Sequence, residues 1–166
     1  DATSTNNVTI NVSIDVLGID INSGYTGTIT QSAGVTVDVG TSDFDISDGT
    51  FTGGDSAITI DDAFTVSGGT FTSTSSNLNI QGAFTVSSGT FDPGTGTVVK
   101  TWFTATWNVN TTETFNNLTL NSANGWGMTI SGGDTLVVTG TLTLTDGYAN
   151  TGTIDAEGDI NQASTF

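Results

Sequence analysis

Three consecutive stretches of this chain align without a gap at a spacing of 20 residues, and this repeat constrains the fold more than any other feature. A period near this length, with short alternating segments, is typical of a β-solenoid in which each repeat forms one coil. Two phenylalanines recur in every copy: Phe44, Phe64 and Phe84 at one position, and Phe51, Phe71 and Phe91 at another. We therefore predict an all-β, right-handed parallel β-solenoid with ~20-residue coils, in which both phenylalanine sets stack as core ladders.

Each coil is expected to contain three short strands. In the second copy they cover Ala63–Val66, Thr70–Thr72 and Asn77–Ile80, and glycine, serine and asparagine occupy the turns. Side chains alternate along a strand, so Phe64 and Val66 point inward together. Parallel strands stack at about 4.8 Å per coil, and eight coils would make a rod on the order of 40 Å long.

The composition excludes several classes of function. The chain has no cysteine, no histidine and a single basic residue against 17 acidic ones, a formal net charge of −16. Nucleic-acid binding needs lysine and arginine to neutralise phosphates, so we expect no nucleic-acid partner. No apolar run is long enough to span a bilayer, so we expect no membrane insertion. These properties together predict an extracellular or cell-surface location.

The N-terminal segment breaks the repeat. Apolar residues alternate strictly with polar ones there, at Val8, Ile10, Val12, Ile14 and Val16. This alternation predicts one long amphipathic strand. We divide the chain into a strand and assembly segment over 1–28 and a solenoid domain over 29–166. The strand either pairs with a neighbouring molecule by donor exchange or folds back as the edge of the first coil.

A second break lies at 98–109, where the alternation slips by one residue. The slip predicts that Val99, Phe103 and Trp107 become the inward face, with Lys100 and Trp102 on the opposite face.

Two segments resemble the β-strand repeats of large bacterial surface proteins. They are Phe115–Leu120 (FNNLTL) and Val138–Gly147 (VTGTLTLTDG). Those proteins include adhesins, S-layer-like proteins and extracellular fibre subunits with right-handed β-helix folds. The resemblance implies a secreted structural or adhesive role, and no catalytic residue can be carried over from it.

An enzyme is an alternative, because parallel β-helices include polysaccharide lyases and glycosidases. A glycosidase needs two carboxylic acids facing each other across a cleft. Glu113 and Glu157 are the only glutamates, and nothing in the sequence brings them together. We predict that the chain is not an enzyme.

Calcium is the one cofactor that the sequence leaves open. Asp43, Asp45, Asp61 and Asp62 are weak candidate ligands, because coil stacking can gather turn carboxylates and calcium takes several oxygen ligands. The alternative is a solvated acidic face, which needs no cofactor.

Threonine and tryptophan side chains suggest two binding functions. Thr50 and Thr52 recur as Thr70 and Thr72, which would form an outward hydroxyl array of the kind that binds ice, but Asp92 interrupts it in the third coil. Separately, Trp102 and Trp126 are aromatics suited to a sugar or protein contact. Lys100 is expected to lie against Trp102 or to pair with Glu113.

The sequence thus favours a structural subunit of an extracellular filament or surface layer. It would polymerise with itself by coil stacking or donor-strand exchange, with Val8, Ile10, Val12, Ile14 and Val16 at the junction. A stalk of a large adhesin is the alternative, followed by a module that binds ice or carbohydrate, which would make a glycan the partner.

Overall fold

The computed structural model describes residues 4–166, and all regular structure in this range is β-strand. The strands form three parallel faces of one stack of coils, which confirms the predicted all-β parallel solenoid. One of the two eight-stranded sheets, from β2 to β21, takes one strand from each coil, so the stack has eight coils. No helix that could cross a membrane is present among the described residues.

The three faces are named here by their strands. Face 1 consists of β1 (Val8–Ile10), β4 (Thr28–Gln31), β7 (Thr50–Thr52), β10 (Thr70–Thr72) and β13 (Thr90–Asp92). Face 2 consists of β2 (Ile14–Val16), β5 (Val37–Val39), β8 (Ile58–Ile60), β11 (Asn77–Ile80), β14 (Thr97–Thr101), β17 (Asn117–Asn121), β19 (Leu142–Asp146) and β21 (Ile160–Thr165). Face 3 consists of β3 (Ile19–Ile21), β6 (Phe44–Ile46), β9 (Phe64–Val66), β12 (Phe84–Val86), β15 (Ala105–Val109), β18 (Gly127–Val138) and β20 (Tyr148–Ala156), and β16 (Thr112–Phe115) joins it through β18.

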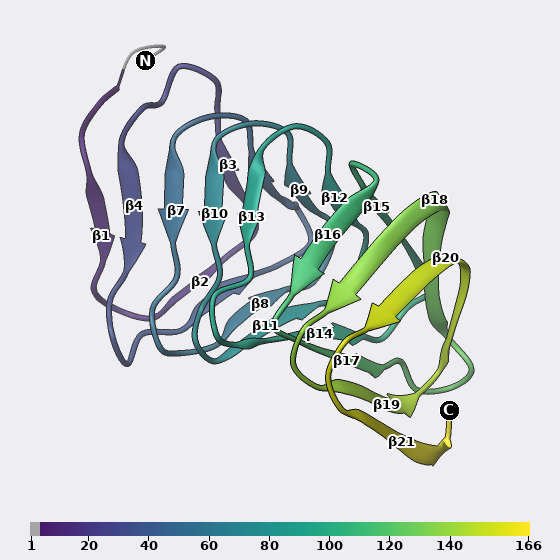
Figure 1. The fold of residues 1–166 in the computed structure, drawn as a ribbon. Helices are drawn as coiled ribbons and strands as arrows, with labels where there is room; N and C mark the ends of the chain where they lie inside the picture. Colours follow the sequence, from purple (N-terminus) through teal and green to yellow (C-terminus); the bar gives the residue numbers. More distant parts are fainter. Residues whose placement is uncertain (1–3) are drawn as a thin grey trace.

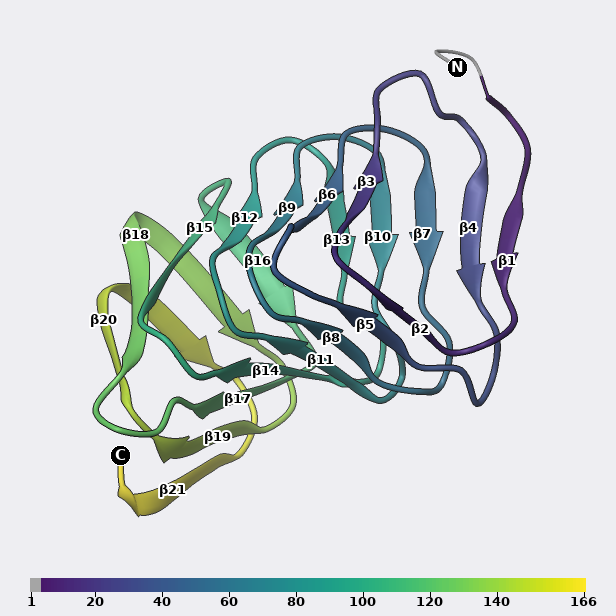
Figure 2. The ribbon, with the colours of Figure 1, turned by 180° about the vertical axis from the view of Figure 1, so that it is seen from behind.

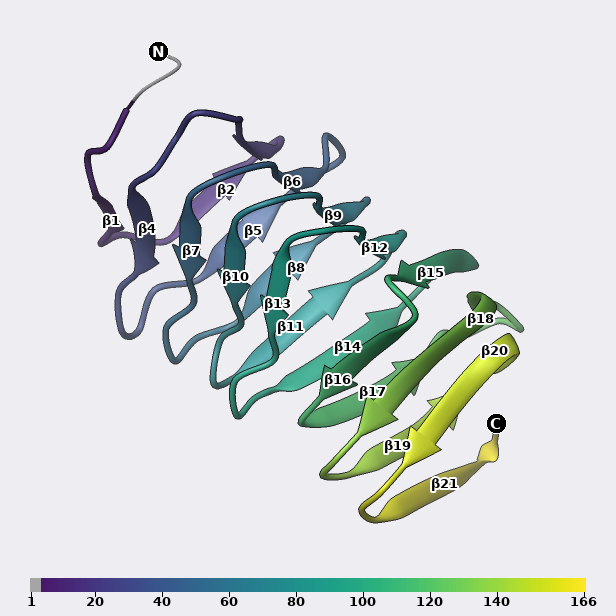
Figure 3. The ribbon, with the colours of Figure 1, turned by 45° about the horizontal axis from the view of Figure 1, so that its top comes forward.

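The coils wind in a right-handed sense. In Figure 1 the chain descends along β1 on the near side, crosses below along β2 and rises along β3 on the far side. Figure 2 shows the same path from behind, with β3 now in front of β4. Right-handed connections between parallel strands are the rule for L-amino acids. The stacked layers from β2 to β21 are visible in Figure 3.

Two aromatic ladders fill the middle coils. Phe51, Phe71 and Phe91 stack nearly parallel, with ring centroids 5.2 and 5.9 Å apart. Phe44 and Phe64 lie 5.5 Å apart in the second ladder, which packs against the first by edge-to-face contacts. Such pairs contribute about 0.5–1.5 kcal/mol each beyond the area that they bury. The strict 20-residue register of these coils therefore places like rings in contact.

The turns between faces 3 and 1 require glycine. Gly69 has φ of 60°, and a Cβ on it would lie 2.5 Å from the carbonyl oxygen of Gly49. A side chain at this position would clash with the coil below, and the backbone conformation itself is unfavourable for L-residues. The recurring glycine is thus a condition for close stacking.

The predicted long N-terminal strand is wrong. Val8–Ile10 and Ile14–Val16 form the separate strands β1 and β2, and Val12 is 65% exposed at the bend between them. β1 pairs with β4 and β2 pairs with β5, so the segment folds back as the first coil, the second of the two alternatives above. Val12 continues the apolar alternation through the bend although its side chain is exposed, and the sequence pattern therefore hides the bend. A separate assembly role for 1–28 stays a prediction, and residues 1–3 of that segment lie outside the described residues.

The predicted inward face at 98–109 is wrong at its start. Lys100 is fully buried, in register between Ile80 and Leu120 in the aliphatic interior of face 2. Val99 lies instead in register with Asn79, one residue away from this inward row, and Phe103 is 54% exposed. The lysine is inward because face 2 keeps its 20-residue register through β14.

The last coils have a different cross-section. Trp107 is buried as predicted and continues the ladder of Phe84, with ring centroids 5.0 Å apart. Beyond it, β18 is long enough to pair first with β15 and then with β16. Gly133, with φ of 93°, lies between the two paired parts. Faces 1 and 3 are therefore joined by continuous strands in this region.

Candidate functional site: the two ends of the stack

The first coil leaves three strand edges without a partner among the described residues. β1, β2 and β3 each stand at the end of their sheet. Ile14, Val16 and Ile19 pack against the core from one side and stay partly exposed on the other. An uncovered edge of parallel strands presents N–H and C=O groups that can pair with another chain. The N-terminal end is therefore both a hydrogen-bonding edge and an apolar surface.

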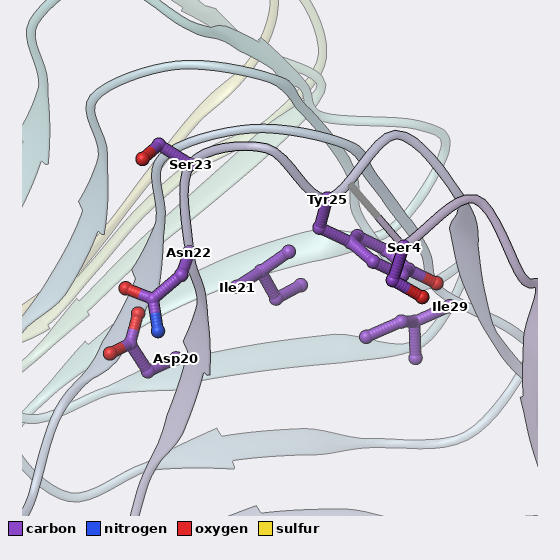
Figure 4. A pocket seen from close by; sticks show the side chains of 7 residues that line it. All are labelled: Ser4, Asp20, Ile21, Asn22, Ser23, Tyr25 and Ile29. Atoms are coloured by element: carbon purple, nitrogen blue, oxygen red, sulfur yellow. The ribbon is translucent and has the colours of Figure 1, made fainter. Parts of the chain in front are cut away.

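A cavity of about 440 Å³ opens at this same end. Figure 4 shows Ile21 on one side of it and Ile29, Tyr25 and Ser4 grouped on the other. The Tyr25 hydroxyl donates a hydrogen bond to the Asn6 carbonyl oxygen at 2.8 Å, which fixes the ring at the rim. The cavity is the open end of the core, and it is large enough to receive apolar side chains.

The C-terminal end is more polar. All six residues of β21 are exposed, and the inward row of face 2 ends in Ile160 and Gln162, paired with Leu142 and Leu144. The Gln162 side-chain amide donates to the Phe166 carbonyl oxygen at 3.4 Å, and Phe166 packs against the core. Phe166 therefore covers part of the interior at this end, as Tyr25 does at the other.

The five residues predicted at the junction all belong to the first coil. Val8 and Val12 are 48% and 65% exposed, whereas Ile10, Ile14 and Val16 are partly buried against the core. They lie on two faces and the bend between them, so the structure brings them to one end without lining them along one strand. Their role in assembly stays a prediction.

Two of the four candidate calcium ligands lie directly before β6 and within it. Asp43, at φ of 58°, accepts a hydrogen bond from the Ala63 N–H at 3.1 Å, so its carboxylate closes a turn between coils. Asp45 lies in register between Asp20 and Thr65. The pKa of Asp45 is raised above its ordinary value. Burial is the main cause, and the nearby charges of Asp43 and Asp20 add to it, whereas the hydrogen bond with Thr65 acts in the opposite direction.

The other two candidates face solvent. Asp61 accepts a hydrogen bond from the Gln81 side-chain amide one coil along, and Asp62 is exposed. No group of three or more histidine, cysteine, aspartate or glutamate side chains is placed to hold a metal ion among residues 4–166. Calcium therefore stays a prediction without a defined site.

Face 1 carries more threonine than the sequence analysis recognised. One row across the strands consists of Thr28, Thr50, Thr70 and Thr90, and the next of Thr9, Thr30, Thr52 and Thr72, ending in Asp92. The segment Thr28–Thr30 was missed because it precedes Thr50 by 22 residues, two more than the period of the central coils. The recurring Thr-x-Thr motif was the signal that identifies it.

Comparison of the chain with protein-family models, curated proteins and solved structures finds no match. The likeness to bacterial surface proteins therefore depends on the sequence motifs, and the structure contributes the solenoid fold.

Proposed function

We propose that this chain is a structural subunit of an extracellular filament or surface layer, joined to its neighbours through the terminal coils. The observation that carries the proposal is the first coil, whose strand edges and apolar cavity are both uncovered. Pairing the edge with a further coil would satisfy its backbone groups, and burying Ile14, Val16 and Ile19 would supply about 25 cal/mol per Å² of apolar surface removed from water.

Head-to-tail contact suits the geometry of a parallel stack. All strands of a face run in one direction, so a coil added to either end keeps parallel pairing. The row that begins at Ile14 ends at Ile160, and stacking one subunit on the next would place these two side chains in adjacent coils. A contact between two different surfaces does not close on itself unless it forms a ring, and it builds a filament.

Charge opposes this contact at low ionic strength. Asp15 and Asp20 lie in the first coil, and Asp155, Glu157 and Asp159 lie in the last two. Salt shortens the range of their repulsion to about 8 Å at physiological ionic strength, and a divalent cation would reduce it further. We therefore expect assembly to strengthen with added salt or calcium.

Sedimentation velocity of wild type and Ile14→Glu tests the proposal. The substitution places a charge at the edge of the first coil, and we expect it to abolish the large species that wild type forms at neutral pH and moderate salt. Thr119→Glu is the matched control, because Thr119 lies on the outward side of β17, in the sixth of the eight coils and away from both ends. It should assemble like wild type.

Circular dichroism must first show that all three proteins keep their β-sheet signal. Wild type that sediments as a single short rod at every salt and calcium concentration would overturn the filament proposal. It would favour the adhesin stalk, in which further coils of the same chain cover these edges.

The threonine rows of face 1 favour a second candidate, an ice-binding face. Two adjacent rows of four threonines each lie on neighbouring parallel strands, with hydroxyls repeated at the coil spacing of about 4.8 Å. β4, β7, β10 and β13 run side by side with the same direction in Figure 1. Such regularity presents water with an ordered array of hydroxyl and methyl groups.

Thermal hysteresis measurements test this candidate with one substitution inside the array and one outside it. Thr52→Tyr would break the array near its centre and should remove most of the activity. Thr59→Tyr, on the outward side of face 2, should leave it unchanged. No hysteresis for wild type would exclude an ice-binding function.

A further inference from the structure

The exposed aromatic side chains of this protein gather at one corner. Trp102, Phe103 and Tyr148 are 53%, 54% and 38% exposed, and among residues 4–166 no other aromatic side chain is exposed to this degree. Trp126 lies beside them and is half-buried. We call these four residues the aromatic corner. Large aromatics are costly to leave in water, so their concentration at one place points to a contact.

The corner spans three successive coils. Trp102 and Phe103 lie between β14 and β15, Trp126 precedes β18, and Tyr148 begins β20. The Trp126 ring centroid lies 4.8 Å from that of Phe103 and 6.5 Å from that of Trp102. β15, β18 and β20 are paired neighbours, and Gly127 is in register with Tyr148, so the rings follow one another along the stack. In Figure 2 the connections that carry them lie at the side of the molecule where β18 and β20 begin.

The buried lysine holds this corner in place. The Lys100 ammonium group donates hydrogen bonds to the carbonyl oxygens of Thr101 and Phe103, both at 2.6 Å, and of Gln81 at 2.7 Å. Its partners are backbone oxygens. They replace the two partners predicted from the sequence, the Trp102 ring and the Glu113 carboxylate. Trp102 has φ of 52°, a left-handed conformation that is strained for a bulky residue. Strain of this kind persists only where surrounding contacts enforce it, and it is concentrated at functional positions.

Polar groups lie next to the rings. The Thr104 hydroxyl lies 3.4 Å from the Tyr148 hydroxyl, and both side chains are exposed. The one basic side chain of the protein is buried under the corner, and the formal net charge is −16. A ligand for this surface therefore combines apolar faces with hydroxyl groups and carries no negative charge.

We propose that the aromatic corner binds a neutral polysaccharide. The C–H faces of a pyranose stack on indole and phenol rings, and sugar hydroxyls pair with groups such as those of Thr104 and Tyr148. Rings on three successive coils would contact consecutive sugar units of an extended chain. A protein partner fits less well, because a standard protein interface takes roughly 20–30 residues per side and the corner offers four large side chains.

Affinity electrophoresis in gels containing hydroxyethylcellulose, galactomannan or mixed-linkage β-glucan tests the proposal, with hyaluronan as the anionic comparison. We expect wild type to be retarded by at least one neutral polymer and not by hyaluronan, and its tryptophan fluorescence to change with the matching oligosaccharide. Trp102→Ala removes one stacking ring and should weaken binding about tenfold or more. A tenfold loss corresponds to roughly 1.4 kcal/mol of binding free energy. Trp102→Phe should retain part of the affinity.

Leu17→Ala is the matched control, because Leu17 is 74% exposed in the first coil, away from the corner. It should bind like wild type. Lack of retardation of wild type by every neutral polymer would overturn the proposal, as would equal binding by Trp102→Ala. Self-association of wild type that Trp102→Ala abolishes, without any sugar effect, would also overturn it by showing that the corner is a protein contact. All variants must show wild-type circular dichroism.

Discussion

The central coils and the C-terminal coils of this solenoid differ in period, in strand length and in the side chains that fill the interior. From Phe44 to Phe91 the period is 20 residues, each coil has three short strands, and the interior is two continuous aromatic ladders. From β14 onward the strands lengthen, faces 1 and 3 join through β18, and a lysine lies in the core. Strict repetition is enough to build a rod, and the departures from it create the exposed aromatic surface.

The comparison predicts that the two regions tolerate truncation of side chains differently. Phe71 is fully buried between two rings, and Phe71→Ala should lower the free energy of unfolding by about 3–5 kcal/mol because it leaves a cavity in a rigid ladder. Leu144 is only partly buried near the end, and Leu144→Ala should cost roughly 1–2 kcal/mol. Denaturant unfolding of both variants measures the difference. Equal losses would contradict a core centred on the aromatic ladders.

Lys100, at the boundary between the two regions, makes the free energy of unfolding depend on pH in the alkaline range. Burial lowers its pKa from 10.5 to about 8. Between these pH values the unfolded chain holds a proton that the folded protein has released, so the free energy of unfolding rises with pH. The slope from one group is at most about 1.4 kcal/mol per pH unit, and it vanishes below the folded pKa.

Urea unfolding of wild type and Lys100→Met from pH 7 to 11 isolates this effect. We expect the difference in unfolding free energy between the two proteins to increase in favour of wild type above pH 8. A difference that does not vary with pH would show that folding does not lower the pKa of Lys100. The same variant should bind neutral polysaccharide more weakly, because the backbone around Trp102 loses its hydrogen bonds.

A smaller effect is expected at the turns that join the first coil to the central coils. Asp48 accepts hydrogen bonds from the N–H groups of Gly24 and Gly49, both at 2.9 Å, and these bonds lower its pKa. Its contribution to stability is therefore present above the ordinary pKa of 3.8 and is lost as the pH falls through the lower folded value. Asp48→Ala should reduce the denaturation midpoint slightly at pH 7, by less than Phe71→Ala or Leu144→Ala.

The matched control for this turn is Asp62→Ala, since the Asp62 carboxylate accepts none of the hydrogen bonds found in the described part of the chain. It should leave the midpoint unchanged. A loss as large for Asp62→Ala as for Asp48→Ala would indicate a general effect of surface charge in place of a specific turn contact.

The fold was predictable from the sequence because the repeat fixes both the period and the inward positions. The prediction of inward residues failed at the start of 98–109, where the local apolar pattern and the 20-residue period indicated different inward positions. One period after Ile80 is Lys100, and the period was the better guide, because backbone carbonyl oxygens satisfy the ammonium group in the core. No pattern in the local sequence predicts that these carbonyl oxygens lie around the ammonium group.

The candidate sites were less predictable. Alternation alone does not distinguish one long strand from two short strands joined by a bend, as at Val12. The cavity beside Ile21 and Tyr25 depends on how the longer turn after β3 folds. The aromatic corner depends on β14, β17 and β19 ending at the same edge, which requires the pairing register of the irregular coils. These features depend on tertiary geometry that a residue pattern does not contain.

Electron microscopy of the wild-type protein at neutral pH, with calcium and then with chelator, tests end-to-end assembly most directly. We expect uniform filaments whose axial repeat corresponds to eight coils, on the order of 40 Å. Loss of the filaments in chelator would show that assembly requires calcium. Dispersed short rods in both conditions would contradict assembly through the open terminal coils.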